Sequence, residues 1–157
     1  MNRKTAILKA TLSAAVVLIG AQVYANTQAF FARTGNFTFA ASTFVPLNDA
    51  GDTLVTFTGS GRRTITYTAE CSNNSANTSS FVNIAILVDG VQLAPTGSNV
   101  ADAFCTANGT PAHDGWVMAA AQGRTANLAA GTHSVRILAS VSAGGGWLGD
   151  SALNVAR

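Results

Sequence analysis

The chain has 157 residues, of which 48% are hydrophobic and only 10% are charged. Its net charge is +2, but Arg3, Lys4 and Lys9 precede a predicted cleavage site after Ala25, so the remaining six arginines and seven acids give a net charge of −1. This balance excludes the basic surface that nucleic-acid binding requires. The part of the chain after Ala25 has a length that fits one domain.

The segment 1–25 has the three parts of a secretory signal peptide. A basic start over 1–4 is followed by an apolar stretch over 10–21 and by Val23-Tyr24-Ala25, whose outer positions suit a signal peptidase. The alternative is a membrane anchor, but a spanning helix needs about 20 apolar residues and this stretch is shorter. We therefore expect a signal peptide over 1–25 and a single domain over 26–157, secreted to the periplasm or outside the cell, with no membrane association after cleavage.

Cys71 and Cys105 are the only cysteines. In an oxidising compartment an isolated pair predicts a disulfide, and the alternative is two free buried thiols. Neither cysteine belongs to a C-x-x-C motif, so thiol redox chemistry is not expected.

Short segments rich in Val, Ile, Thr and Phe, separated by Gly, Asn, Asp and Pro, predict β-strands, and no segment after residue 25 has helical periodicity. In the first half, strict alternation over 62–71 points Ile65, Tyr67, Ala69 and Cys71 inward. The strands expected there cover 28–33, 36–40, 42–47 (an edge strand, because of Pro46), 53–58 with Val55 and Phe57 inward, and 62–71.

In the second half, 81–88 is apolar on nearly both faces and is expected at the centre of a sheet. Asp89-Gly90 then predicts a tight hairpin into 91–93. The remaining expected strands are 101–106, 116–121 and 124–128 around a turn at Gln122-Gly123, 133–141 with Val135, Ile137, Ala139 and Val141 inward, 147–149 and 151–155.

Roughly ten short strands favour an all-β, antiparallel, two-sheet jelly-roll-like β-sandwich. The segment Leu128–Ile137, the later Gly146-Trp147-Leu148, the closing 152–155 and the hairpin 86–91 resemble secreted jelly-roll modules, including complement-type and tumour-necrosis-factor-like heads. The resemblance is confined to the second half of the chain. It implies a jelly-roll fold, and such families include trimeric heads and carbohydrate-binding modules. A homo-oligomer is therefore expected, also because a surface of low charge resists association poorly.

The sequence contains few residues that could form a catalytic or metal-binding site. His113 stands beside Asp114 and His133 begins a predicted strand, and loop or edge histidines of this kind are usually not catalytic. Asp49 and Asp52 share a segment that suits either a calcium site or, more commonly, a plain turn. We therefore expect no catalytic residues, no metal, no cofactor and no enzymatic activity.

Trp116 and Trp147 are the only tryptophans. They are either core residues, the commoner placement, or exposed platforms that bind a ligand such as a sugar ring, and Trp147, which follows the glycines at 144–146, is the better candidate for a platform. The leading hypothesis is a non-catalytic module for protein interaction or structural assembly. The alternatives are a carbohydrate-binding module and, third, a small extracellular hydrolase that uses His113.

Overall fold

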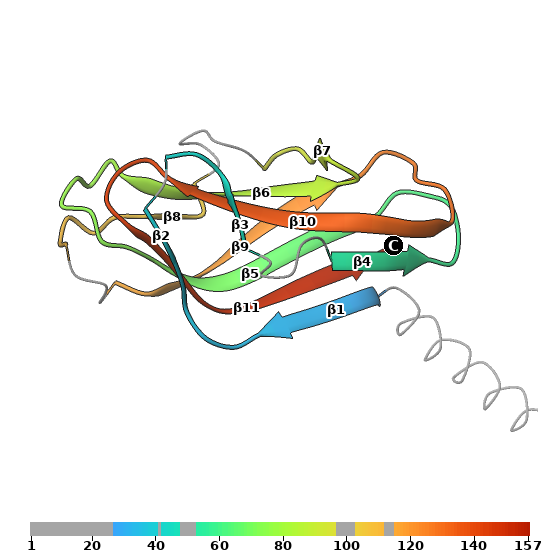
Figure 1. Cartoon of the computed structure of the whole chain (residues 1–157), viewed down its shortest axis with the longest axis horizontal. Helices are drawn as coiled ribbons and strands as arrows, with labels where there is room; N and C mark the ends of the chain where they lie inside the picture. Colours follow the sequence, from blue (N-terminus) through green and yellow to red (C-terminus); the bar gives the residue numbers. More distant parts are fainter. Residues whose placement is uncertain (1–26, 41, 48–52, 97–102, 112–114) are drawn as a thin grey trace, which may run out of the picture.

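Two antiparallel β-sheets pack face to face in the computed structural model, which describes residues 27–40, 42–47, 53–96, 103–111 and 115–157 (Figure 1). Within these ranges the chain forms eleven strands and no helix. Consequently no helix there is long and apolar enough to cross a membrane. The predicted signal segment lies outside the described residues.

The strands divide between two sheets. Sheet A contains β1 (Thr27–Arg33), β2 (Phe37–Phe39), β5 (Thr64–Asn73), β9 (Val117–Arg124) and β11 (Gly146–Ala156). Sheet B contains β3 (Val45–Pro46), β4 (Thr53–Phe57), β6 (Phe81–Val88), β7 (Val91–Gln92), β8 (Cys105–Thr106) and β10 (Gly131–Val141).

The strand order is that of a jelly roll. Sheet A runs β1-β11-β5-β9, with β2 also on β11, and sheet B runs β3-β10-β6-β7, with β4 on β10 and β8 on β6. The chain alternates between the sheets, and its first and last strands are neighbours. This arrangement is the pair of Greek keys that defines the jelly roll, so the predicted fold class is confirmed.

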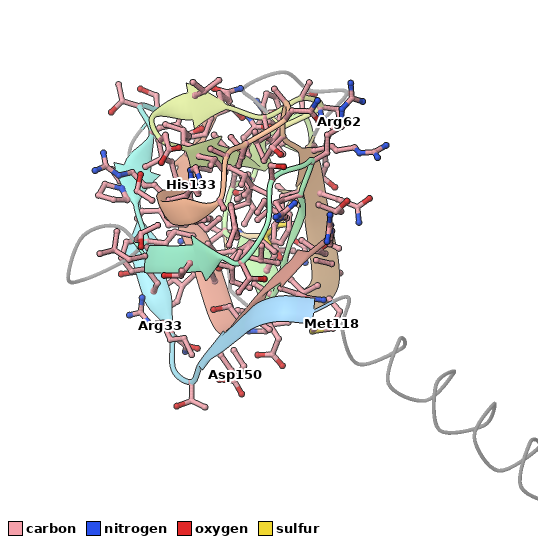
Figure 2. All side chains as sticks on the ribbon, turned by 90° about the vertical axis from the view of Figure 1, so that its right-hand side faces the viewer. Arg33, Arg62, Met118, His133 and Asp150 are labelled. Atoms are coloured by element: carbon pink, nitrogen blue, oxygen red, sulfur yellow. A yellow bond between two sulfur atoms is a disulfide. The ribbon has the colours of Figure 1, made fainter. Side chains whose placement is uncertain are left out.

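The core lies between the sheets, and Figure 2 shows side chains filling this space while Arg62 and Asp150 lie at its outside. Each fully buried aliphatic side chain contributes about 1.5–3 kcal/mol, so this layer dominates stability. The predicted inward positions of β4, β5 and β10 are all buried, which confirms those three strands. They are Val55, Phe57, Ile65, Tyr67, Ala69, Cys71, Val135, Ile137, Ala139 and Val141.

The centre of sheet B also follows the prediction. Strand β6 lies between β10 on one side and β7 and β8 on the other, and residues 82–86 are all buried. Asp89 and Gly90 connect β6 to β7 with φ angles of 49° and 78°. Positive φ at both positions is the requirement of the tight hairpin turn, so the predicted Asp-Gly hairpin is confirmed.

The turn predicted at Gln122-Gly123 is wrong, because β9 continues through both residues. Gly123 is buried, and a Cβ atom there would lie 2.6 Å from the Cβ of Leu93. The glycine therefore permits close packing of the hairpin segment on the strand rather than a change of direction.

The two short strands predicted at the end of the chain form one strand, β11. Its register on β5 shifts between Leu148 and Ser151, which are paired with Cys71 and Ala69. Three steps along β11 thus correspond to two along β5, which is a β-bulge of one extra residue. The bulge lets the strand continue where the glycines and Asp150 suggested an interruption.

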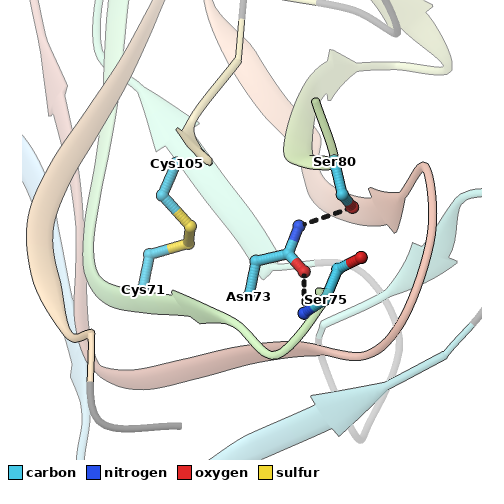
Figure 3. Close-up of a disulfide and its surroundings, with 5 residues drawn as sticks. All are labelled: Cys71, Asn73, Ser75, Ser80 and Cys105. Carbon is cyan, nitrogen blue, oxygen red and sulfur yellow. Dashed lines mark hydrogen bonds between the residues drawn. A yellow bond between two sulfur atoms is a disulfide. The ribbon is translucent and has the colours of Figure 1, made fainter. Parts of the chain in front are cut away.

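The predicted disulfide is present and joins the two sheets. Cys71 lies on β5 of sheet A and Cys105 on β8 of sheet B, with a Cα–Cα distance of 6.2 Å (Figure 3). Both side chains are buried, so no thiol is available. The bridge ties the β7–β8 region to the central strand of the opposite sheet.

We expect the variant Cys71→Ala/Cys105→Ala to lose about 3.8 kcal/mol of unfolding free energy, because a bridge between residues 34 positions apart restricts the unfolded chain. Urea titrations of both proteins measure the difference. Reductant should lower the wild-type midpoint and leave that of the variant unchanged. Equal midpoints for the oxidised wild type and the variant would contradict a stabilising bridge.

Candidate functional site

Both tryptophans lie on the outer face of sheet A, in one row across three strands. Trp147 of β11 is paired with Ser72 of β5. Trp116 immediately precedes Val117, which is paired with Cys71, so the antiparallel register places Trp116 beside Ser72 on the other side. Residues opposite one another share a face of the sheet, so the two indole rings flank Ser72.

Neither tryptophan belongs to the core, so the core interpretation is wrong for both. Trp116 is 37% exposed and Trp147 is half-buried. The side chains of Val117 and Met118 next to Trp116 are 49% and 70% exposed. Val117 is paired with Cys71 and so is on the inner face, at the edge of the sheet, whereas Trp116 and Met118 form an apolar surface in contact with water on the outer face.

Gly149, in the β11 bulge, lies against the side chains of Trp116 and Glu70. A Cβ atom at Gly149 would lie 3.3 Å from Cζ3 of Trp116 and 2.5 Å from Oε2 of Glu70. The Trp116 ring therefore extends from β9 across β5 towards β11, with the Glu70 carboxylate beside it. Any larger residue at 149 would displace both groups. We call Trp116, Trp147, Glu70, Ser72 and Gly149 the tryptophan face.

Three polar groups of the tryptophan face, on Ser72, Glu70 and Trp116, make no hydrogen bond to the described residues. The Ser72 hydroxyl is buried, with 1% of the residue exposed, and has no hydrogen bond. Among the described residues, the exposed Glu70 carboxylate and the Trp116 indole N–H also make none. An exposed aromatic ring beside a free acceptor and a free donor can bind a ligand that has both apolar and hydroxyl groups. Sequence reasoning missed Glu70, Ser72 and Gly149, because their proximity depends on strand register.

Hydrogen bonds hold the loops beside Trp147. The Asn73 side chain donates to Ser80 Oγ at 2.9 Å and accepts from the Ser75 backbone N–H at 3.1 Å (Figure 3). The Asn74 backbone N–H donates to the Gly145 carbonyl at 3.1 Å. The β5–β6 and β10–β11 loops are thereby connected, which supports the start of β11 and with it Trp147.

A second cluster of polar residues surrounds His133 on β10. Nδ1 of His133 lies 2.7 Å from Oδ2 of Asp89, and Nε2 lies 3.1 Å from the Ala129 carbonyl oxygen. The imidazole stacks on Phe57 at 4.8 Å, and the buried Arg63 guanidinium lies 4.7 Å from the same phenyl ring. Acceptors thus occupy both ring nitrogens of His133, which suits a structural imidazolium and leaves no nitrogen for proton abstraction.

The contacts of His133 and Asp89 change the pKa of each group. The hydrogen bond to Asp89 raises the pKa of His133, and the Ala129 carbonyl acts in the same direction against burial and the charge of Arg63. The hydrogen bond from His133 lowers the pKa of Asp89, with a further contribution from the Ser134 backbone N–H. The ion pair is therefore favoured near neutral and mildly acidic pH.

A cavity of about 150 Å³ opens between the sheets near the β1–β2 turn, lined mainly by apolar groups. Its one charged group already has a partner, because Arg33 donates to the Leu47 carbonyl at 2.8 Å. Burial raises the pKa of Tyr67, so its hydroxyl stays protonated. The cavity therefore offers little to orient a polar ligand.

The other candidates from the sequence, His113 with Asp114 and Asp49 with Asp52, lie outside the described residues. Within the described ranges, no three His, Cys, Asp or Glu side chains gather to form a metal site.

No protein-family model and no curated protein sequence matches the chain. Among solved structures, it is similar to a carbohydrate-binding module of Cellvibrio mixtus lichenase 5A in complex with cellotriose, with 18% identity over 83% of this chain and 88% of that one, at a TM-score of 0.42. A family 35 carbohydrate-binding module from Clostridium thermocellum has 14% identity over 82% and 93% of the chains, at a TM-score of 0.36. The VP2 subviral particle of infectious bursal disease virus has 13% identity over 82% of this chain and 32% of that one, at a TM-score of 0.46. The class of this protein, a jelly-roll β-sandwich, rests on its own strand order.

We expect His133 to make stability depend on pH. A raised pKa means that its contribution is complete below the ordinary value of about 6.5 and is lost as the pH rises through the value in the folded protein. As the pH rises above about 6.5, the urea midpoint of the wild type should therefore fall by more than that of His133→Gln.

The matched control is His113→Gln, which removes the other histidine, keeps the Asp89–His133 pair and should retain the wild-type pH profile. Parallel profiles for the wild type and His133→Gln would contradict this role of His133.

Proposed function

We propose that this chain is a secreted, non-catalytic binding module that binds a glycan on the tryptophan face. The observation that carries the proposal is the exposed Trp116 ring beside the Glu70 carboxylate, which makes no hydrogen bond or ion pair to a described residue. The face of an indole ring is electron-rich and attracts the C–H groups on the apolar side of a pyranose. A carboxylate next to the ring accepts hydrogen bonds from sugar hydroxyls, and such charge-assisted bonds are strong.

The shape of the face favours an extended ligand. Trp116 and Trp147 belong to strands separated by β5, so their backbones are about 9.6 Å apart, twice the strand spacing. The positions beyond this row, such as Thr68, Ala120 and Ala152, have short side chains that form no wall. A short chain of sugar rings therefore fits this flat surface better than a single enclosed sugar.

Secretion is supported by two independent features. The segment 1–25 has the signal-peptide pattern, and Cys71 and Cys105 form a disulfide, a bond typical of oxidising compartments. The absence of catalysis is part of the proposal, and it is consistent with the occupied ring nitrogens of His133.

A role in protein contact has support of its own. The exposed Val117 and Met118 lie on β9 at the rim of sheet A. Protein contact at the edge of β9 would use its backbone N–H and C=O groups, and glycan binding would use side chains on the outer face, so this strand can serve both roles.

Tryptophan fluorescence tests the proposal directly, because the only two tryptophans of the chain lie on the proposed site. Titration with soluble oligosaccharides from β-glucan, xylan, chitin and α-glucan should shift or quench the emission for at least one of them. Trp116→Ala should weaken this binding about tenfold or more, measured by calorimetry, because the ring supplies most of the exposed apolar contact.

The matched control is Leu54→Ala on β4. Leu54 is 67% exposed but belongs to sheet B, so its loss should leave the affinity unchanged. Unchanged affinity of Trp116→Ala, or no response to any oligosaccharide in the panel, would overturn the proposed glycan site.

A further inference from the structure

Strand β9 is an open edge of sheet A. In the described part of the chain its one strand partner is β5. It is eight residues long, and Figure 2 shows it at the outside of the sandwich near the labelled Met118. One side of its backbone therefore carries N–H and C=O groups that no described strand satisfies.

The other edge strands are shorter than β9. In sheet B, β3, β7 and β8 have two residues each and β4 has five, and β1, the other edge of sheet A, has seven and ends in the charged Arg33. Natural proteins also protect edges with Pro, Lys or inward charges. From Trp116 to Gly123, β9 and its entry contain no proline and no charged residue. This strand lacks each of those protections.

The side chains of β9 suit pairing. Val117 and Met118 are 49% and 70% exposed at one end, and Ala119-Ala120-Ala121 occupies the centre. Small central side chains allow another strand to approach without a steric clash on either face. An eight-residue edge strand whose first seven residues are uncharged is a template for an added strand.

We propose that a second copy of this chain pairs with β9, antiparallel, about a twofold axis at Ala120. Ala120 of one copy then faces Ala120 of the other. On either side of this position, Ala119 of one copy faces Ala121 of the other, and Met118 faces Gln122. All facing pairs share a face of the sheet, as antiparallel pairing requires. The two copies of sheet A then form one continuous sheet, and the contact is the same patch on both copies.

The position of the one charged residue of β9 favours this register, and it favours a second copy of the chain as the added strand. The one charged residue of β9 is Arg124, and the axis at Ala120 places it opposite Trp116 of the second copy rather than opposite another arginine. Both side chains are on the outer face of the sheet, where a guanidinium beside an indole ring gains a cation–π contact. The strand is thus complementary to itself in both shape and charge.

Light scattering coupled to size-exclusion chromatography tests the pairing on the chain without its signal segment. The wild type should have the mass of a dimer. Ala120→Lys places two like charges directly opposite one another at the axis and should give the mass of a monomer. The matched control is Val91→Lys, which adds the same charge at an exposed position of the short edge strand β7 and should stay dimeric.

A second variant tests the register without disturbing the contact. Cα atoms directly opposite one another in an antiparallel pair are about 4.5–5.5 Å apart, within the range of a disulfide. Ala120→Cys should therefore form a cross-linked dimer on mild oxidation, and Val91→Cys should not.

A monomeric wild type at high concentration overturns the proposal, including the case in which β9 pairs only with a strand of another protein. A dimer that survives Ala120→Lys and fails to cross-link through Ala120→Cys also overturns it. The proposed contact reaches Trp116, so glycan affinity is measured on the monomeric Ala120→Lys variant, which keeps the tryptophan face intact. The two proposals can then fail independently.

Discussion

The antiparallel register that joins β11, β5 and β9 is the constraint on which the rest of the structure depends. Because side chains alternate along a strand, this register determines which residues enter the core and which face water. Because β11 also holds β5 in place, a slip of one residue between β5 and β9 would reverse β9 and bring Trp116 inward. The same alignment therefore buries one row of residues and displays the opposite row on the outer surface.

The polar and apolar features of sheet A follow from the low charge of the chain. With few charged residues, its outer face is built from Thr, Ala, Ser and Gly, and large exposed side chains are rare. The exposed apolar groups at one rim, Trp116, Val117 and Met118, stand out for this reason. A ligand on the face and a second strand at the edge would each remove part of this surface from water.

The glycines show which structural roles can be predicted from the local sequence and which depend on residues far away in the chain. Gly90 is correctly predicted as a turn residue because the Asp-Gly pair acts locally, through the φ angles of two adjacent residues. Gly123 and Gly149 are not at strand ends, and each is small because a distant side chain lies against it: Leu93 in one case, Glu70 and Trp116 in the other. No local pattern distinguishes these two uses of glycine.

The sequence by itself determined the alternating burial of β5 and β10, the central place of β6, the hairpin after it and the pairing of the two cysteines. These features follow from period-two hydrophobicity, from turn chemistry or from there being one partner to choose. Only the tertiary structure decided that Trp116 and Trp147 lie outside the core and that Glu70 and Ser72 stand between them. Their proximity arises from the pairing of strands far apart along the chain and from a bulge of one residue in β11, and neither is encoded in the sequence near those residues.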